Sequence, residues 1–235
     1  NFNGDDVIDI ILEQKQCARY ISEKIYKYFV NENINQNHID KMTKVFYEDY
    51  NIENLMRYVL LSDWFYDDEN IGVKIKSPVE FLVGIHQIVP YKMLKEKQLI
   101  FLQRLLGQVL MRPPNVAGWK TGRNWIDSNT IVTRLRLASV LLNNAQITYS
   151  DLGDEETTLS DFKKRKLRRK TFIKTEADWD TFQKNYGKFS KKELIPLVIT
   201  TKLSKDTEEM LLKNNEMPIQ DFCVQLMSLP EYQLC

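Results

Sequence analysis

The chain has 235 residues, which fits one large domain or two small ones, and folding should bury roughly 73% of the unfolded surface. With 33 Lys and Arg residues against 32 Asp and Glu residues, the formal net charge is +1, so no overall field attracts nucleic acid or a membrane surface. The 8 glycines and 7 prolines, with 28% charged and 43% hydrophobic residues, indicate a globular chain that favours helices and exclude a disordered or fibrous one.

Apolar residues recur at helical spacing over the first sixty positions and predict four helices. Asp5 or Asp6 is expected to cap the first helix, and Asn51 is placed to cap the fourth. The stretch 62–76 contains three aromatic residues and an acidic cluster but no periodic apolar stripe. We therefore expect an exposed connection there.

The strongest helix start in the sequence follows this connection. Ser77 is a capping residue, Pro78 occupies the first helical position, and Glu80 stands three residues after the cap, so orphan amides are satisfied in both directions. This helix should run until Pro90 interrupts it, and the next helix should run through positions 99–109. These two helices are predicted to form the centre of the core.

The second half of the chain is predicted to hold one long helix and three short ones. Asp127 or Ser128 caps the long helix, which should turn one apolar face inward. The residues of this face are Ile131, Leu135, Ala138 and Leu142. The short helices cover 176–186, 204–213 and 218–229. No alternation of period two is long enough to predict a sheet.

We therefore predict an all-α fold, a single irregular multi-helix domain with one ordered loop rich in proline, glycine and tryptophan. Residues 1–142 should form a helical core that carries this ordered loop at 111–126. Residues 143–175 should form a charged surface insertion, and residues 176–235 should form C-terminal helices that pack on the same core.

The loop 111–126 differs in composition from its surroundings. The window 107–122 holds three of the eight glycines, where random placement would give about 0.5, and this indicates a specified backbone. Planar polar groups and two indoles in and beside the loop form a mixture that suits a glycan or protein partner. The candidate binding residues are Arg112, Asn115, Trp119, Arg123, Asn124, Trp125 and Asn129.

A structural alternative explains the same composition without a ligand. In that alternative, Trp119 and Trp125 fill the gap between two helices, while Arg112 and Arg123 bond carbonyl groups left open at a helix end. The loop would then be a rigid strut, and both interpretations stay open at this stage.

Motifs that carry catalytic or metal chemistry were not found in the sequence. No nucleophile elbow, glycine-rich phosphate loop, zincin helix or EF-hand loop is present. His38 and His86 have no second histidine or cysteine at ligand spacing, and Cys17, Cys223 and Cys235 are an odd count without close spacing. We expect no catalytic residue in this chain, no metal, no cofactor and no disulfide framework, and whether the protein is an enzyme stays open.

A basic run at 163–170 is the strongest electrostatic feature, with seven basic residues out of eight. It contains no aromatic residue, and an acidic stretch at 151–156 precedes it. This pattern favours a solvated arm over a specific nucleic-acid site, although an anionic polymer bound at low salt is the alternative. No apolar stretch approaches the roughly 20 residues that a membrane-spanning helix needs, so no transmembrane segment is predicted.

Several segments together resemble the bacterial family called domain of unknown function 1800. The most recognisable is the run Pro-Pro-Asn-Val-Ala-Gly-Trp at 113–119. The others are 4–7, 18–25, 28–30, 76–81, 107–108 and 125–126. The resemblance is dense over residues 1–142, skips the charged segment 151–170 and resumes at 228–232.

This resemblance implies the C-terminal half of an exported bacterial helical protein, located in the periplasm, at the cell surface or outside the cell. Its own N-terminal half would then be one partner. The family transfers no catalytic role to any residue here. We therefore expect a non-enzymatic binding or scaffold module, with a glycan or protein at residues 112–126. The alternative is the C-terminal half of an envelope-polymer hydrolase whose catalytic groups lie in the N-terminal half.

Overall fold

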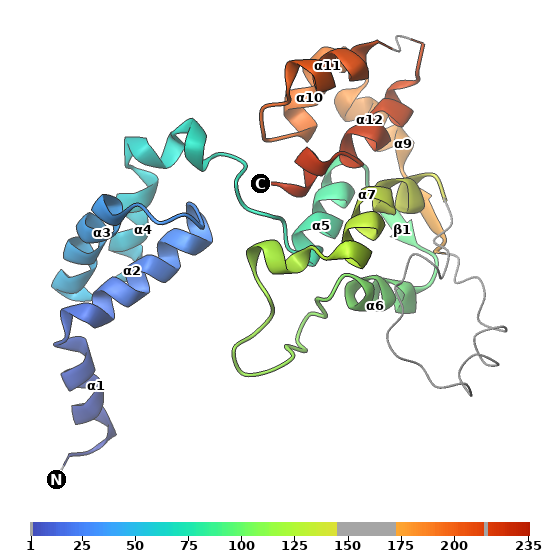
Figure 1. The fold of residues 1–235 in the computed structure, drawn as a ribbon. Helices are drawn as coiled ribbons and strands as arrows, with labels where there is room; N and C mark the ends of the chain where they lie inside the picture. The colour runs from blue at the N-terminus through green and yellow to red at the C-terminus, as the bar shows by residue number, and fades with distance from the viewer. Residues whose placement is uncertain (1, 145–172, 214–215) are drawn as a thin grey trace. The chain divides into compact units, whose positions relative to one another are not determined.

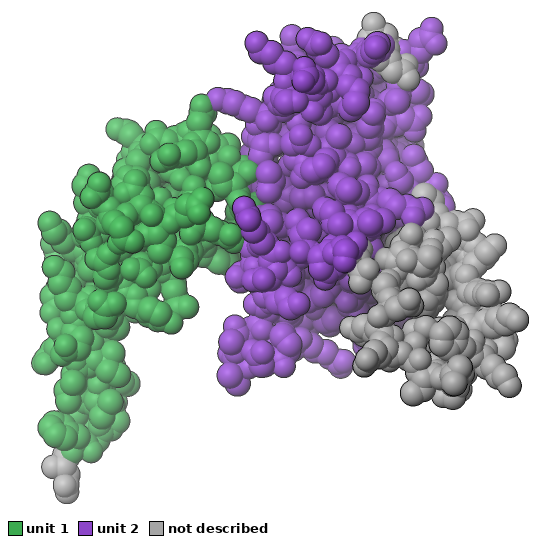
Figure 2. Space-filling model, in the orientation of Figure 1, with its two compact units in different colours: residues 1–74 green, residues 75–235 purple. Residues whose placement is uncertain are grey.

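The computed structural model describes residues 2–144, 173–213 and 216–235. These residues contain eleven α-helices and one sheet of two short strands, which confirms the predicted all-α class (Figure 1). The chain divides into two compact units, Asn1–Lys74 and Ile75–Cys235 (Figure 2). No helix in the described part of the chain is long and apolar enough to cross a membrane.

The first unit contains four helices, and all but the first of them pack around one apolar cluster. They are α1 (Gly4–Leu12), α2 (Lys15–Phe29), α3 (Gln36–Asp49) and α4 (Ile52–Leu60). The buried members of the cluster come from α2, α3, α4 and the residue after α2, and are Ala18, Tyr26, Val30, Ile39, Met42, Phe46, Leu55 and Val59. The expected connection at 62–76 holds two short 3-10 turns, Asp63–Tyr66 and Asp68–Asn70.

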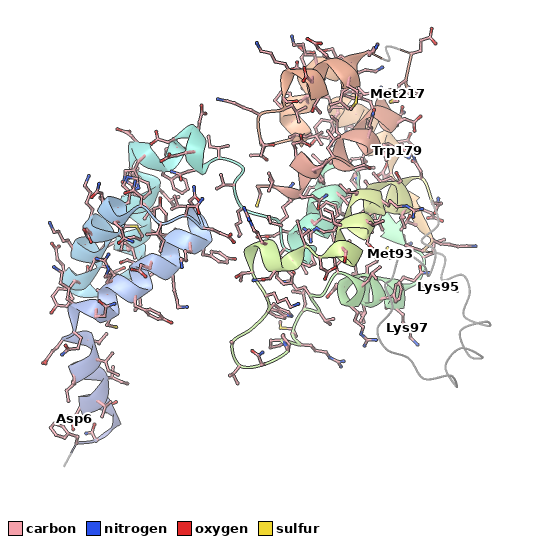
Figure 3. All side chains as sticks on the ribbon, in the orientation of Figure 1. Asp6, Met93, Lys95, Lys97, Trp179 and Met217 are labelled. Carbon is pink, nitrogen blue, oxygen red and sulfur yellow. The ribbon has the colours of Figure 1, made fainter. Side chains whose placement is uncertain are left out.

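The helix caps of the first unit confirm one prediction from the sequence and correct another. Asn51 caps α4 as predicted, because its side-chain oxygen accepts the Glu53 amide at 2.8 Å. The predicted cap of α1 was wrong by two or three positions. Asn3 is the cap, and its Oδ1 accepts the amide of Asp6 at 3.0 Å while the Asp6 carboxylate (labelled in Figure 3) accepts the Asn3 amide at 2.8 Å. Asp6 therefore completes a capping box from inside the first turn.

The second unit has seven described helices around a larger apolar cluster. They are α5 (Pro78–Ile88), α6 (Glu96–Leu105), α7 (Ser128–Leu142), α9 (Trp179–Tyr186), α10 (Lys191–Val198), α11 (Lys205–Leu212) and α12 (Ile219–Met227). Helices from both ends of this unit contribute to one core. Its largest fully buried apolar side chains are Phe81, Ile85, Leu102, Leu106, Phe182, Phe222 and Tyr232.

A short sheet joins two segments that are distant in the sequence. Strand β1 (Tyr91–Met93) pairs antiparallel with β2 (Thr175–Ala177). The helix predicted from position 176 therefore begins later, at Trp179. Asp178 caps it by accepting the Thr181 amide at 2.9 Å, so the residues before Asp178 are free to pair as a strand.

A buried arginine ties three segments of the second unit together. Arg134 of α7 is fully buried, and its Nε donates to Gln233 Oε1 at 2.8 Å while its Nη2 donates to the carbonyl of Lys76. Its guanidinium lies over the Phe81 ring at 5.1 Å, and burial lowers the pKa of Arg134 to about 10. The Lys76 ammonium in turn donates to the Tyr232 carbonyl at 2.8 Å. This cluster links α7, the residues entering α5 and the C-terminal turn.

Candidate functional site

The loop between α6 and α7 leaves its helix through a defined stop signal. Gly107 has a φ of +89°, in the left-handed region, and its amide donates to the Arg104 carbonyl at 3.1 Å. The next amide, of Gln108, donates to the Gln103 carbonyl at 2.8 Å. These two bonds form a Schellman motif, which satisfies carbonyls that the end of α6 would leave open. The chain then runs out as a long loop and returns to α7 (Figure 1).

Two glutamine side chains fix the first part of this loop. The Oε1 atom of Gln103 accepts the Leu110 amide at 3.0 Å, and the Oε1 atom of Gln108 accepts the Val79 amide at 3.0 Å. The second bond connects the loop to the first turn of α5, where amides lack partners within the helix. The loop therefore starts from a fixed position in the second unit.

A tight turn at the tip presents Asn115 to solvent. Its Oδ1 accepts the Ala117 amide at 2.9 Å, and its backbone carbonyl accepts the Gly118 amide at 3.1 Å. Gly118 has a φ of +87°, which favours glycine at this position. The side-chain oxygen of Asn115 therefore stabilises the turn itself.

The return end of the loop is anchored by a buried indole and a helix cap. Trp125 is only 6% exposed and ends a 3-10 turn, Gly122–Trp125. Its carbonyl accepts the Thr130 hydroxyl at 3.1 Å, and Asp127 caps α7 by accepting the Thr130 amide at 2.8 Å. Of the two predicted caps of α7, the structure therefore selects Asp127.

The structure describes six of the seven candidate side chains, and these differ in exposure. Arg112, Asn115, Arg123 and Asn124 are exposed. Trp119 is half-buried, and Trp125 is inside, so Trp125 cannot contact a partner in this conformation. Asn129 lies in the first turn of α7, and its side chain is outside the described part of the structure.

Trp119 is intermediate between the exposed candidate residues and the buried Trp125. Its Nε1 atom is buried and has no hydrogen-bond partner among the described residues. An unpaired buried donor of this kind costs about 1–3 kcal/mol. This unpaired donor offsets part of the stability that comes from burying the Trp119 indole.

The loop fits the structural alternative only in part. Trp125 fills space inside the second unit, as that alternative requires. Neither Arg112 nor Arg123 bonds a helix-end carbonyl within the described ranges, and both side chains are exposed. The two arginines are thus available to another molecule.

The two histidines have structural surroundings. His38 stacks on Trp64 with ring centroids 4.2 Å apart, and its Nδ1 is buried without a partner in the described residues. His86 lies edge-on to Tyr91 at 5.0 Å. Within the described ranges, no group of three or more His, Cys, Asp and Glu side chains could hold a metal ion.

Titration of His38 should make stability depend on pH. Burial and the nearby Lys41 lower the pKa of His38 below 6.5, so the unfolded chain binds the proton more tightly than the folded one. The free energy of unfolding should therefore fall as the pH drops from about 7 to about 5.5, through the window below the unfolded pKa. Urea denaturation at the two pH values measures this change. His38→Phe should reduce it, and an unchanged pH dependence in His38→Phe would contradict the assignment.

The three cysteines are free thiols with different exposure. Cys235 is exposed, Cys17 is half-buried and Cys223 is buried. Burial raises the pKa of the Cys223 thiol to about 12, so this thiol stays protonated and unreactive in the folded chain. Cys223 is part of the apolar core and has no sign of a chemical role.

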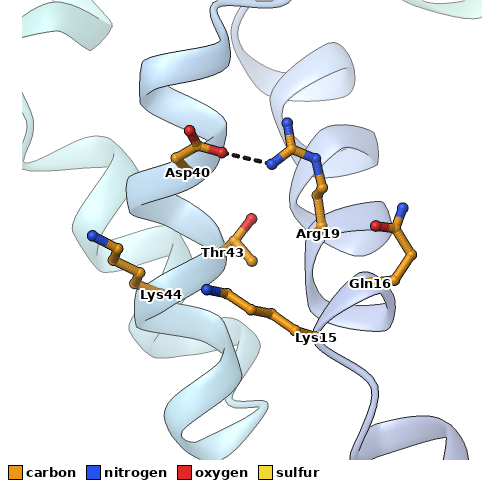
Figure 4. A pocket seen from close by; sticks show the side chains of 6 residues that line it. All are labelled: Lys15, Gln16, Arg19, Asp40, Thr43 and Lys44. Atoms are coloured by element: carbon orange, nitrogen blue, oxygen red, sulfur yellow. Dashed lines mark hydrogen bonds and ion pairs between the residues drawn. The ribbon is translucent and has the colours of Figure 1, made fainter.

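The first unit contains a pocket that was not predicted from the sequence. It has a volume of about 430 Å³ and lies between α2 and α3 (Figure 4). Its lining residues are Lys15, Gln16, Arg19, Asp40, Thr43 and Lys44. The sequence places Lys15 and Arg19 one turn apart on one helix and Asp40 and Lys44 one turn apart on another, but only packing shows that the two pairs face the same space.

The basic run at 163–170, the acidic stretch at 151–156 and most of the segment predicted as an insertion lie outside the described residues. Expectations about their role therefore stay predictions.

The fold and the loop define a helical protein in which an ordered, arginine-bearing loop joins two core helices. The family described as protein of unknown function (DUF1800) matches residues 1–234, and the chain belongs to this family. The match includes the charged segment that the resemblance seen in the sequence had skipped. Comparisons with curated proteins and with solved structures found no match.

Proposed function

We propose that the chain is a non-enzymatic helical binding or scaffold module of an exported bacterial protein, and that the loop 111–126 contacts its partner. One observation carries this proposal. The loop is fixed at both ends by hydrogen bonds and a buried indole, while Arg112 and Arg123 remain exposed and bond no helix end in the described residues.

Fixed ends favour recognition because a pre-organised loop loses less conformational entropy on binding. The Schellman motif at Gly107 and the cap at Asp127 are each internal to the chain, so the loop keeps its start and end without a ligand. The exposed polar groups between them can then be presented in one arrangement.

A protein partner fits the loop better than a glycan. Met111 is 94% exposed and Val116 is fully exposed, and Arg112 directly follows Met111 in the loop. Methionine and arginine are enriched in protein interfaces. The indole of Trp125, which would be expected to stack on a sugar, is buried instead.

Site-specific crosslinking in the host cell tests this proposal. A photoreactive amino acid at Val116 of the natural protein should give a discrete protein adduct, and the same residue at Lys97, exposed on α6 (Figure 3), should not. Arg112→Glu combined with Arg123→Glu should abolish the adduct at Val116. Because both arginines are exposed, the double variant should keep its stability within about 0.5 kcal/mol.

Other results of the crosslinking and glycan-binding experiments would lead to different conclusions. Equal adducts at Val116 and Lys97, or none at Val116, would contradict a protein interface at the loop. An adduct formed only within the same polypeptide would favour the alternative of a hydrolase completed by an N-terminal half. Loss of binding to a glycan array in the double variant, without any protein adduct, would identify a glycan as the partner.

A further inference from the structure

The pocket of the first unit collects positive charge between two helices. Lys15 and Arg19 come from α2, and Lys44 comes from α3, so three cations line the pocket beside a single carboxylate, that of Asp40. The ammonium group of Lys15 lies between the helices next to Thr43, as Figure 4 shows.

Arg19 is already neutralised inside the protein. Its Nη1 atom is 2.6 Å from Asp40 Oδ1, and its Nε atom is 3.3 Å from Glu23 Oε1. Its Nη2 atom donates to Gln36 Oε1. The guanidinium therefore acts as a fixed wall of the pocket that joins α2 to α3, and it also takes up the charge of Asp40.

Lys15 and Lys44 differ from Arg19 in their charged surroundings. Within the described residues, neither Lys15 nor Lys44 has a carboxylate within ion-pair distance, and both are exposed at the pocket. The Thr43 hydroxyl cannot donate to a ligand, because it donates to the Ile39 carbonyl at 2.7 Å. The pocket thus presents two positive charges that have no ion-pair partner among the described residues.

We propose that this pocket binds a phosphate monoester, with Lys15 and Lys44 as the charged contacts and Gln16 as a neutral donor. A phosphate monoester carries about −1.5 to −2 charges at neutral pH, which matches two lysines, whereas a single carboxylate would leave one lysine unbalanced. Lysine binds phosphate as a point charge. The volume of about 430 Å³ leaves room for an organic group beyond the phosphate.

Two sources share this chemistry, a soluble organic phosphate and a phospholipid headgroup. Glycerol 3-phosphate and vesicles of phosphatidylcholine containing phosphatidic acid are the matching probes. Both lysines are exposed, so binding to either probe should weaken as salt is added.

The test is an NMR titration of the full chain with glycerol 3-phosphate, with vesicle flotation as the second arm. Saturable shifts should appear at the amides of Lys15 and Lys44. Lys15→Gln combined with Lys44→Gln should weaken binding about tenfold, since two exposed ion pairs are lost. The matched control is Lys27→Gln combined with Lys41→Gln, which removes the same charge from the same two helices outside the pocket and should change affinity less than about twofold.

Each possible result either supports or overturns the proposed phosphate site. Binding of glycerol 3-phosphate that depends on Lys15 and Lys44 supports a soluble phosphate, and flotation with that dependence but no response to glycerol 3-phosphate supports a headgroup. Equal losses in both double variants would show a general charge effect and overturn the site. Absence of saturable binding in both arms would also overturn it. Far-UV circular dichroism of the variants checks that they fold.

Discussion

Trp125→Ala should lower the free energy of unfolding by about 3–5 kcal/mol, because truncating a buried tryptophan loses its apolar contacts and leaves a cavity. Trp125 is 6% exposed and closes the loop onto the second unit. Trp119→Ala should cost clearly less, since Trp119 is half-buried and its Nε1 atom has no partner in the described residues. Urea denaturation followed by far-UV circular dichroism measures both changes.

The contrast between the two variants assigns the roles in the loop. If Trp125→Ala left stability unchanged but removed a crosslinked partner, Trp125 would be a contact residue, and its burial would have to be reversed on binding. If Trp119→Ala were the more destabilising change, the half-buried indole would be the anchor of the loop instead.

Arg134→Ala is the second change with a large expected effect, a loss of about 3–5 kcal/mol. The variant removes a fully buried side chain and leaves Gln233 Oε1 and the Lys76 carbonyl without their donor. Arg104→Ala, at an exposed position of α6, is the control and should stay within about 0.5 kcal/mol. Urea denaturation of both variants gives the comparison.

Arg134→Met separates packing from hydrogen bonding. Methionine fills much of the space and carries no charge, so the remaining loss, about 1–3 kcal/mol, reports the unpaired acceptors. A loss below about 1 kcal/mol for Arg134→Ala would contradict a structural role for the cluster.

Local signals allowed much of the fold to be predicted. The capping box at Ser77 and Glu80 is present, with the Ser77 amide donating to the Glu80 carboxylate at 2.7 Å, and Asn51 caps α4. These predictions succeeded because a cap depends on residues three positions apart. Helix α10 was not predicted, although Ser190 and Glu193 form the same box and were a usable signal.

Predictions failed where the local structure depends on residues that are distant in the sequence. The strand pair brings Tyr91 opposite Ala177, and two strands of three residues carry no periodicity of their own. On α7, Ile131 and Leu135 were expected to face inward, but both are half-buried and Arg134 is fully buried. Hydropathy alone cannot place an arginine in a core, because its burial depends on acceptors supplied by Lys76 and Gln233.

For the candidate loop, the order of the backbone was predicted better than the burial of its side chains. Composition indicated an ordered loop, and the structure contains the glycine turns and the cap that order it. The burial of Trp125 was predicted only by the structural alternative, which treated it in the same way as Trp119, because a loop has no periodic face from which an inward direction can be inferred. The pocket between α2 and α3 was missed for a related reason, since it belongs to two helices and neither helix alone contains it. The division into two units was also not among the predictions.

The contacts between the first and last residues of the second unit affect how the protein folds during synthesis. Ile75, its first residue, forms a β-bridge with Leu234, and Tyr232 lies in the same core as Phe81. The first unit, by contrast, is formed by residues 1–74 alone. During synthesis, the first unit can therefore fold while the ribosome is still translating, but the second must wait for its last residues to emerge. Until then α5 and α6 expose apolar surface, and this interval is when a chaperone would be needed.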